Sequence, residues 1–243
     1  MVAAVPLDLA VERHPGLNPV VLVHGFASDA RSTWEATGWY RALSDAGRGV
    51  IAVDLRGHGA SPKPDNPDSY SPSVLASDIV CVLDVEGVQQ VDIIGYSMGS
   101  QVARQLAADH PSRVSSLVLG GIGTSEQFAR WGARAVREAL IDGISVDDPV
   151  LDGLLTAAAA LPLESRLALA ACAEGMAQHP VTAIPDVSTL VVTGELDHIA
   201  EGADRLAMEL GAAWITIPGR HHGSTVSARA FKQAAVEFIQ SPK

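Results

Sequence analysis

The sequence is short of cysteine and of positive charge. Its 243 residues include only two cysteines, Cys81 and Cys172, and both fall in apolar segments with helical spacing. We therefore expect two buried free thiols, which suits a reducing compartment such as the cytoplasm. The chain has 17 lysines and arginines against 28 acidic residues, a net charge of −11, and no basic run. This balance argues against nucleic acid or an anionic membrane surface as a partner.

Long apolar runs and cofactor motifs are also missing. The longest helical apolar stretch, LLTAAAALPL, contains Pro162 and is shorter than the roughly 20 residues that span a bilayer. The first residues, MVAAVPLDLAVERHP, lack a charged segment followed by a long apolar one, so we expect no signal peptide. No glycine-rich loop matches a phosphate or dinucleotide motif, and no His, Cys and carboxylate set has metal-ligand spacing. We predict no cofactor and no metal.

What the chain does contain is an alternation of short apolar runs and helical patterns. An edge strand is expected at Val5–Glu12. A strand buried on both faces is expected at Pro19–Val23, and further buried strands at Val50–Val53, Val91–Ile94 and Ser116–Leu119. Two more strands are expected at Thr189–Val192 and Trp214–Ile217. Helices are expected between them, including Thr33–Ala46, Ser73–Glu86, Asp204–Leu210 and Ala228–Ile239. Such alternation implies a parallel sheet with helices on both faces, an α/β fold.

One block interrupts this alternation. From Thr124 to about Pro185 the strand-like runs disappear, and Ala-rich and Leu-rich helical stretches replace them, at Ala129–Leu140, Val150–Ala160 and Glu164–Gln178. We interpret residues 124–185 as a small helical cap, inserted in a core made of residues 1–123 and 186–243. The cap carries Phe128, Trp131, Leu140, Leu163 and Met176. We expect these side chains to pack the cap against the core, with Trp131 also facing the ligand.

A Gly-x-Ser-x-Gly sequence follows one predicted strand and precedes a helix. In VDIIGYSMGS the turn brings Gly95 and Gly99 so close together that larger side chains would collide. The turn lifts the Ser97 hydroxyl clear of the sheet edge, next to the free N–H groups at the start of a helix. This context indicates a nucleophile elbow, in which Ser97 is the nucleophile.

Other polar residues follow the ends of other predicted strands: His24-Gly25-Phe26, Asp197 and His221-His222. Ligands of open parallel sheets bind outside the carboxyl ends of the strands, so all these groups should face one crevice. A serine hydroxyl needs an adjacent base, histidine supplies one, and an acid must orient the histidine. The chain order Ser97, Asp197, His222 fits that arrangement. From the residues alone, Glu195 and His221 stay open as alternative acid and base.

The chain resembles the α/β-hydrolase superfamily, in particular compact bacterial esterase-like members with a short helical cap. The resemblance rests on VVLVHGF, DLRGHGAS, GYSMGS, SLVLGGIG, TLVVTGELD and IPGRHHGS, which spread from Val20 to His222. It implies a twisted, mostly parallel sheet and a serine hydrolase that cleaves carboxylic esters or lactones through an acyl-enzyme. Relatives with haloalkane dehalogenase or epoxide hydrolase chemistry place aspartate where this chain has Ser97.

The resemblance also chooses between the alternative acids and bases. The sequence GELD matches the family's Gly-x-x-Asp, which implies Asp197 rather than Glu195 as the acid. The family loop has Pro-Gly, two intervening residues and then His, which puts His222 rather than His221 in register.

Two backbone N–H groups should hold the oxyanion, and each is worth roughly 3–4 kcal/mol. One belongs to Met98, the residue after the nucleophile, and the resemblance implies Phe26 for the other. We expect the side chains of Phe26 and Met98 to line the acyl pocket. His24 and His58 are expected to hold loops.

Two other functions compete with the ester hydrolase. The same triad can serve hydrolysis of carbon–carbon bonds or perhydrolysis, and some proteins of this fold are small-molecule receptors or signalling proteins. The sequence specifies neither the natural substrate nor the oligomeric state.

Overall fold

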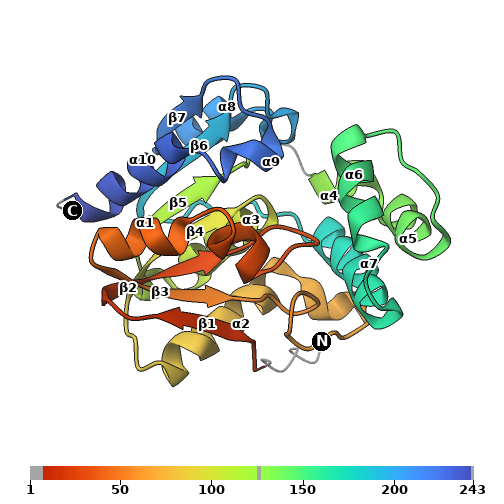
Figure 1. The fold of residues 1–243 in the computed structure, drawn as a ribbon, viewed down its shortest axis with the longest axis horizontal. Coiled ribbons are helices and arrows are strands. Elements are labelled where there is room, and N and C mark those ends of the chain that lie inside the picture. The colour runs from red at the N-terminus through yellow and green to blue at the C-terminus, as the bar shows by residue number, and fades with distance from the viewer. Residues whose placement is uncertain (1–7, 125–126, 242–243) are drawn as a thin grey trace.

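The computed structural model describes residues 8–124 and 127–241, and within them seven strands form one sheet. The strands are β1 (Val11–His14), β2 (Leu17–Val23), β3 (Arg48–Val53), β4 (Val91–Tyr96), β5 (Val114–Gly120), β6 (Ser188–Gly194) and β7 (Ala213–Ile217). Their spatial order is β1-β3-β2-β4-β5-β6-β7. β1 is antiparallel to β3, and all other neighbours are parallel. The predicted α/β fold with a mostly parallel sheet is confirmed (Figure 1).

The helices are α1 (Trp39–Asp45), α2 (Pro72–Val85), α3 (Met98–Asp109), α4 (Gln127–Trp131), α5 (Ala133–Asp142), α6 (Pro149–Ala158), α7 (Leu163–Gln178), α8 (Ala203–Glu209), α9 (His222–Thr225) and α10 (Arg229–Gln240). Short turns of other helix types are η1 (Arg31–Glu35), η2 (Pro67–Tyr70), η3 (Pro111–Arg113) and η4 (His198–Ala200). No helix of the described ranges is both long and apolar enough to cross a membrane.

Two predicted helices are each broken in two. The segment Thr33–Ala46 divides at Gly38, whose φ is +84°, and Ala129–Leu140 divides at Gly132, whose φ is +77°. A residue in the left-handed region cannot continue a right-handed helix, so each glycine ends one helix and begins another. The edge strand expected at Val5–Glu12 begins only at Val11, and its residues 5–7 lie outside the described ranges.

The central strands send alternate side chains into two hydrophobic cores. In β2, Val21 and Val23 belong to the core that contains α2, α3 and α8. Val20 and Leu22 belong to the core that contains α1 and α10. Because both faces are covered, the strand is an unbroken apolar run, and each buried side chain contributes roughly 1.5–3 kcal/mol. The two hydrophobic cores hold the strand ends, and the loops that follow them, in fixed positions.

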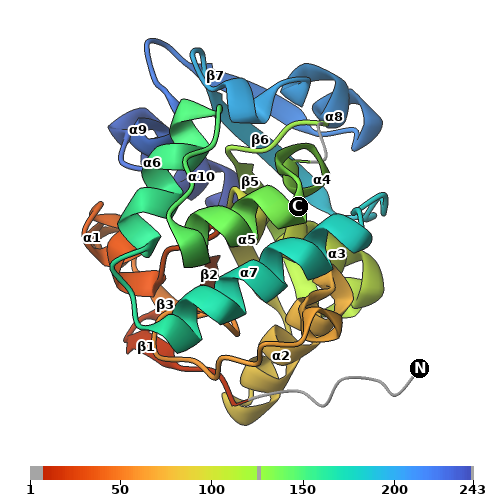
Figure 2. The same cartoon turned by 90° about the vertical axis from the view of Figure 1, so that its right-hand side faces the viewer.

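Helices α4–α7 connect β5 to β6 and form a group of their own at the right of Figure 1. Figure 2 shows α5 between α6 and α7 in front of the sheet. The rings of Phe128 and Trp131 in α4 lie 5.4 and 6.4 Å from that of Phe26, which follows the carboxyl end of β2. These helices, called the cap helices below, therefore sit by that edge of the sheet.

The expected packing residues of the cap do not all behave alike. Phe128, Leu140 and Met176 are buried, and Trp131 is partly buried against the same core. Leu163, the first residue of α7, is exposed to solvent and does not pack the cap against the core.

Both cysteines are free thiols, as expected, but they differ in burial. Cys172 is buried in the core, and its sulfur lies 3.8 Å from that of Met98. Burial raises the pKa of the Cys172 thiol. Cys81 is only half-buried.

Candidate active site

Ser97 stands on a strained turn between β4 and α3. Its φ of +54° and ψ of −119° lie outside the conformations that non-glycine residues usually adopt. A Cβ atom on Gly95 would come within 2.5 Å of the Gly99 carbonyl oxygen, and one on Gly99 would overlap the carbonyl oxygen of Val23. The two glycines are thus required by close backbone approach, as the sequence predicts. The turn is held further by the Ser97 N–H, which donates to the Gly120 carbonyl at 2.8 Å.

Asp197 follows the end of β6, and its side chain is buried. One carboxylate oxygen accepts hydrogen bonds from the N–H groups of Ile199 and Ala200, at 3.1 and 3.3 Å. These donors belong to the first turn of η4, where N–H groups have no partner within the helix. The carboxylate is therefore fixed by its own loop.

His222 opens α9, and its Nδ1 lies 2.9 and 3.0 Å from the two carboxylate oxygens of Asp197. A carboxylate only accepts hydrogen bonds, so Nδ1 carries a proton, and in the neutral ring the lone pair is therefore on Nε2. The ring packs 5.2 Å from the Tyr96 ring. A Cβ atom on Gly121 would lie 2.9 Å from His222 Cε1, so the small residue after β5 leaves room for the imidazole.

The alternative residues lie elsewhere. His221 is exposed and precedes α9, where its carbonyl accepts from Ser224 and Thr225. Glu195 is exposed, and its carboxylate accepts from the Gly219 N–H at 2.8 Å. The structure therefore brings together Asp197 and His222, whereas the Glu195 carboxylate binds the neighbouring loop at Gly219.

Ser97 and His222 open on one cavity of about 250 Å³. Apolar side chains that line it include Phe26, Trp131, Leu154, Ile199 and Val226. The hydrogen bonds of the described residues include the Asp197–His222 pair but none between Ser97 Oγ and His222. The proposed nucleophile and the proposed base thus line the same cavity without a hydrogen bond between them.

The expected oxyanion donors belong to the two segments beside the nucleophile. A Cβ atom on Gly25 would lie 3.3 Å from Ser97 Cβ, so the chain that leads to Phe26 passes directly by Ser97. Met98 is the first residue of α3, where N–H groups have no acceptor within the helix. We expected the Met98 side chain to line the acyl pocket, but it is buried against Cys172 of α7 and does not line the cavity. Phe26 and Trp131 do line the cavity.

His24 and His58 hold loops, as expected. The Nδ1–H of His24 donates to the Gly25 carbonyl at 2.8 Å, and its Nε2 accepts from the Leu55 N–H at 3.0 Å. His58 Nδ1 donates to the Arg56 carbonyl at 3.0 Å. Burial lowers the pKa of both imidazoles, for His58 to about 3 with a contribution from neighbouring His24, so both are neutral. Neither lines the cavity of Ser97.

Sequence reasoning missed the part that Tyr96 plays. This residue lies within the Gly-x-Ser-x-Gly motif, and its hydroxyl donates to the backbone carbonyl of His222. The motif indicates where Tyr96 stands but not what its side chain reaches, because that contact depends on how α9 docks. Among the described residues, no group of three or more His, Cys, Asp or Glu side chains is placed to hold a metal ion.

A family model described as alpha/beta hydrolase fold matches residues 18–215. Epoxide hydrolase B of Mycobacterium tuberculosis is 36% identical over 119 residues, which are 46% of this chain and 30% of that protein. The 2-hydroxymuconate semialdehyde hydrolase of Pseudomonas putida is 41% identical over 108 residues, 44% of this chain and 37% of that protein. The matches thus span about a third of the length of these curated relatives.

A solved structure with a similar fold is that of a thermophilic esterase from Thermogutta terrifontis with malate bound. It superposes with a TM-score of 0.79 over 96% of this chain and 93% of that chain, at 24% sequence identity. At this level of identity the likeness concerns the fold.

Proposed function

Because the chain belongs to the α/β-hydrolase fold family, we propose that it is a serine hydrolase that cleaves carboxylic esters of small hydrophobic substrates, lactones included. The observation that carries the proposal is the contact of His222 with Asp197 at the wall of the cavity that Ser97 also lines. A nucleophile, a base and an orienting acid from three separate strand ends converge there.

The first half-reaction forms an acyl-enzyme. His222 Nε2 takes the proton of the Ser97 hydroxyl while Oγ attacks the carbonyl carbon, and the carbonyl electron pair moves to its oxygen. The backbone N–H groups of Phe26 and Met98 stabilise that oxyanion. Asp197 holds the imidazole in its tautomer and stabilises the imidazolium. When the tetrahedral adduct collapses, the C–O bond breaks and Nε2 delivers its proton to the alcohol.

The second half-reaction reverses the roles. A water molecule gives a proton to His222 Nε2 and attacks the acyl carbon, and the oxyanion forms again at the same donors. The Ser97 oxygen then leaves and regains its proton from the imidazolium, and the carboxylic acid departs. In a lactone the alcohol and the acid are the two ends of one opened chain.

The cavity supports small, apolar substrates. Its volume of about 250 Å³ is slightly below the roughly 300–1,000 Å³ typical of ligand pockets. Six of the fourteen residues that line it are aromatic or aliphatic, and apolar atoms form most of its surface. Short acyl groups and small alcohols meet both conditions.

The relatives favour different members of this reaction class. The structural neighbour named an esterase agrees with the proposal. The epoxide hydrolase likeness is weakened by Ser97, since epoxide-hydrolysing relatives place aspartate at this position. The Pseudomonas putida relative makes 2-hydroxymuconate semialdehyde a second candidate substrate for the same triad.

A substrate panel tests the proposal directly. Purified protein is assayed with p-nitrophenyl acetate and butyrate, with five- and six-membered lactones, and with 2-hydroxymuconate semialdehyde. We expect ester turnover that falls at least about 10⁴-fold in Ser97→Ala. A fluorophosphonate should label Ser97, as read by mass spectrometry. The matched control is Ser73→Ala, which removes an exposed hydroxyl on α2.

The outcomes separate the candidate functions. Ser97-dependent turnover of the semialdehyde alone would replace esters as the substrate class. Small-molecule binding without turnover or labelling would identify a receptor and overturn the proposal.

A further inference from the structure

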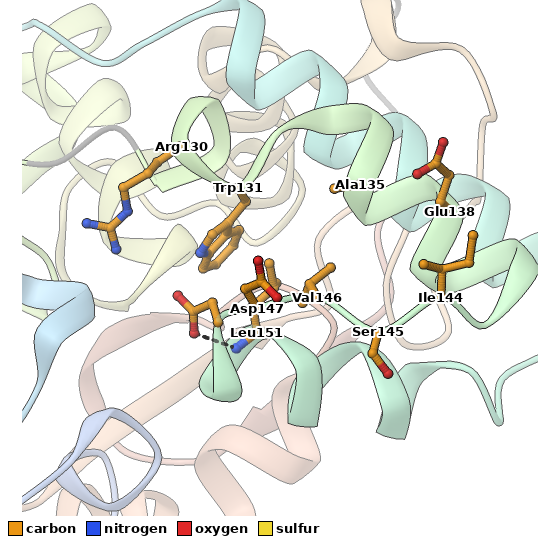
Figure 3. Close-up of a pocket in the computed structure, with 10 residues that line it drawn as sticks. Arg130, Trp131, Ala135, Glu138, Ile144, Ser145, Val146, Asp147 and Leu151 are labelled. Carbon is orange, nitrogen blue, oxygen red and sulfur yellow. Dashed lines mark hydrogen bonds between the residues drawn. The ribbon is translucent and has the colours of Figure 1, made fainter.

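A cavity larger than the one at Ser97 lies among the cap helices. Its volume is about 450 Å³, and its wall is formed by α4, α5, the start of α6 and the segment between α5 and α6 (Figure 3). Trp131 belongs to its wall and also to the wall of the Ser97 cavity. Among the described residues that line the two cavities, it is the only one that they share.

Helix α6 shows that the two cavities adjoin. Leu151 lines the cap cavity and Leu154 lines the Ser97 cavity. Three residues along a helix cover about 4.5 Å and return to nearly the same face. The two cavities therefore lie next to each other along α6, and Trp131 belongs to the wall of both.

Aromatic packing holds the Trp131 ring at this boundary. Its centroid lies 5.3 Å from that of Phe128 in an edge-to-face arrangement and 6.4 Å from that of Phe26 in a tilted one. Aromatic pairs in these arrangements stabilise the position of the ring beyond the burial of its area. The indole is thus held on the side where Phe26 lines the Ser97 cavity, while its other side meets the cap cavity.

We propose that Trp131 sets the length of the substrate: its ring closes the Ser97 cavity and separates it from a second subsite in the cap that fits an uncharged alkyl chain. This inference rests on the proposed function. The cap cavity offers apolar contacts from Ile144, Val146 and Leu151. The same wall holds the carboxylates of Glu138, Asp147 and Asp148 and one guanidinium, that of Arg130. This net negative charge disfavours an anionic chain end.

The first test is a chain-length profile. For p-nitrophenyl esters from C2 to C10, wild-type kcat/KM should fall beyond short acyl groups. In Trp131→Ala each methylene that enters the cap cavity should improve kcat/KM about fourfold, so the C8 to C2 ratio should rise more than tenfold. Trp131→Phe keeps an aromatic ring at the boundary and should keep a profile close to that of the wild type. An unchanged ratio in Trp131→Ala would overturn the proposal.

A second variant tests whether the chain occupies the cap cavity. Ala135 lies on α5 at this cavity and is absent from the wall of the Ser97 cavity (Figure 3). Ala135→Leu should change nothing by itself, because Trp131 already closes the passage. Combined with Trp131→Ala, it should remove the gain for C8 and C10 esters and leave C2 turnover unchanged. A gain that survives in the double variant would mean that the chain leaves by another route.

A binding measurement separates this inference from the proposed hydrolase. Methyl ketones imitate esters and cannot be hydrolysed, and they can be bound to Ser97→Ala protein. We expect 2-undecanone to raise the melting temperature of Ser97→Ala/Trp131→Ala more than that of Ser97→Ala, whereas 2-pentanone should act on both alike. This result with no ester turnover in the wild type would uphold the partition and reject the hydrolase. Equal shifts with 2-undecanone would reject the partition even if esters are hydrolysed.

Discussion

The Tyr96 hydroxyl donates a hydrogen bond to the backbone carbonyl of His222, although the two residues are 126 positions apart. Burial raises the pKa of Tyr96 far above its ordinary value, with a further contribution from the Asp197 carboxylate. The hydroxyl therefore remains a donor throughout the working pH range of a protein. Tyr96, the residue before the proposed nucleophile, thus fixes the backbone of the proposed base.

Tyr96→Phe should impair catalysis through this contact. A hydrogen bond of this kind contributes about 1 kcal/mol, so we expect kcat to fall about fivefold and the melting temperature by about 2–4 °C. The control is Tyr40→Phe, which removes a hydroxyl bonded to Glu12 at 3.0 Å outside the cavity. It should lower stability without changing kcat. Equal kcat values in the two variants would show that the Tyr96 contact supports the fold only.

Asp197→Asn should lower kcat by about 10⁴-fold. The amide preserves the shape of the side chain, but its NH₂ group can donate to His222 and favours the wrong tautomer of the ring. Ester turnover and circular dichroism should be measured together, since the fold should persist. The control Glu195→Gln alters a carboxylate that accepts from the Gly219 N–H, and its kcat should stay within about twofold of wild type. Asp197→Asn protein with a tenth of the original kcat would contradict the proposed role.

The strands were predictable because burial on both faces leaves a continuous apolar run. The run over Val20–Val23 is fully buried, with alternate residues in the two cores. The breaks at Gly38 and Gly132 were not predictable, because a single glycine within a helical pattern is usually tolerated. Its conformation depends on how the flanking helices dock, and this is not a local property.

In the candidate site, too, features set by local sequence were predictable and those set by the docking of distant helices were not. Ser97, Asp197 and His222 follow strand ends, so topology and motif together were enough to bring them to one edge of the sheet. Met98 was assigned to the wrong surroundings, because its side chain reaches Cys172, 74 residues along the chain. Local sequence determines that α3 begins at Met98, but the docking of α7 determines where that side chain lies.

Gly99, in the turn after Ser97, and Gly153, in cap helix α6, can be compared in a stability test. In Gly99→Ala the new methyl group would overlap the Val23 carbonyl oxygen, which belongs to the fully buried end of β2 and cannot move away. We expect a loss of about 3 kcal/mol in the free energy of unfolding. In Gly153→Ala, within α6, the methyl group meets no atom within 4 Å. That variant should gain up to about 1 kcal/mol from helix propensity. Thermal unfolding measures both, and equal effects would contradict the close approach at Gly99.

Acid should destabilise the protein through its buried histidines. The pKa of His58 is about 3 in the folded chain, because burial and neighbouring His24 oppose its charge. An unfolded histidine titrates near 6.5. As the pH falls from about 6.5 toward 3, the unfolded chain takes up a proton that the folded chain does not, so stability decreases over this window. Burial lowers the pKa of His24 as well, which acts in the same direction.

His58→Gln should make this decrease shallower. One proton of difference contributes up to about 1.4 kcal/mol per pH unit, and removing the imidazole removes that contribution. Glutamine retains a donor for the Arg56 carbonyl, which His58 now bonds at 3.0 Å, so the loop should keep its shape. The free energy of unfolding is measured by urea titration between pH 7 and 4, with His179→Gln, an exposed histidine after α7, as the control. Parallel pH slopes for wild type and His58→Gln would mean that the imidazole becomes protonated within the folded protein.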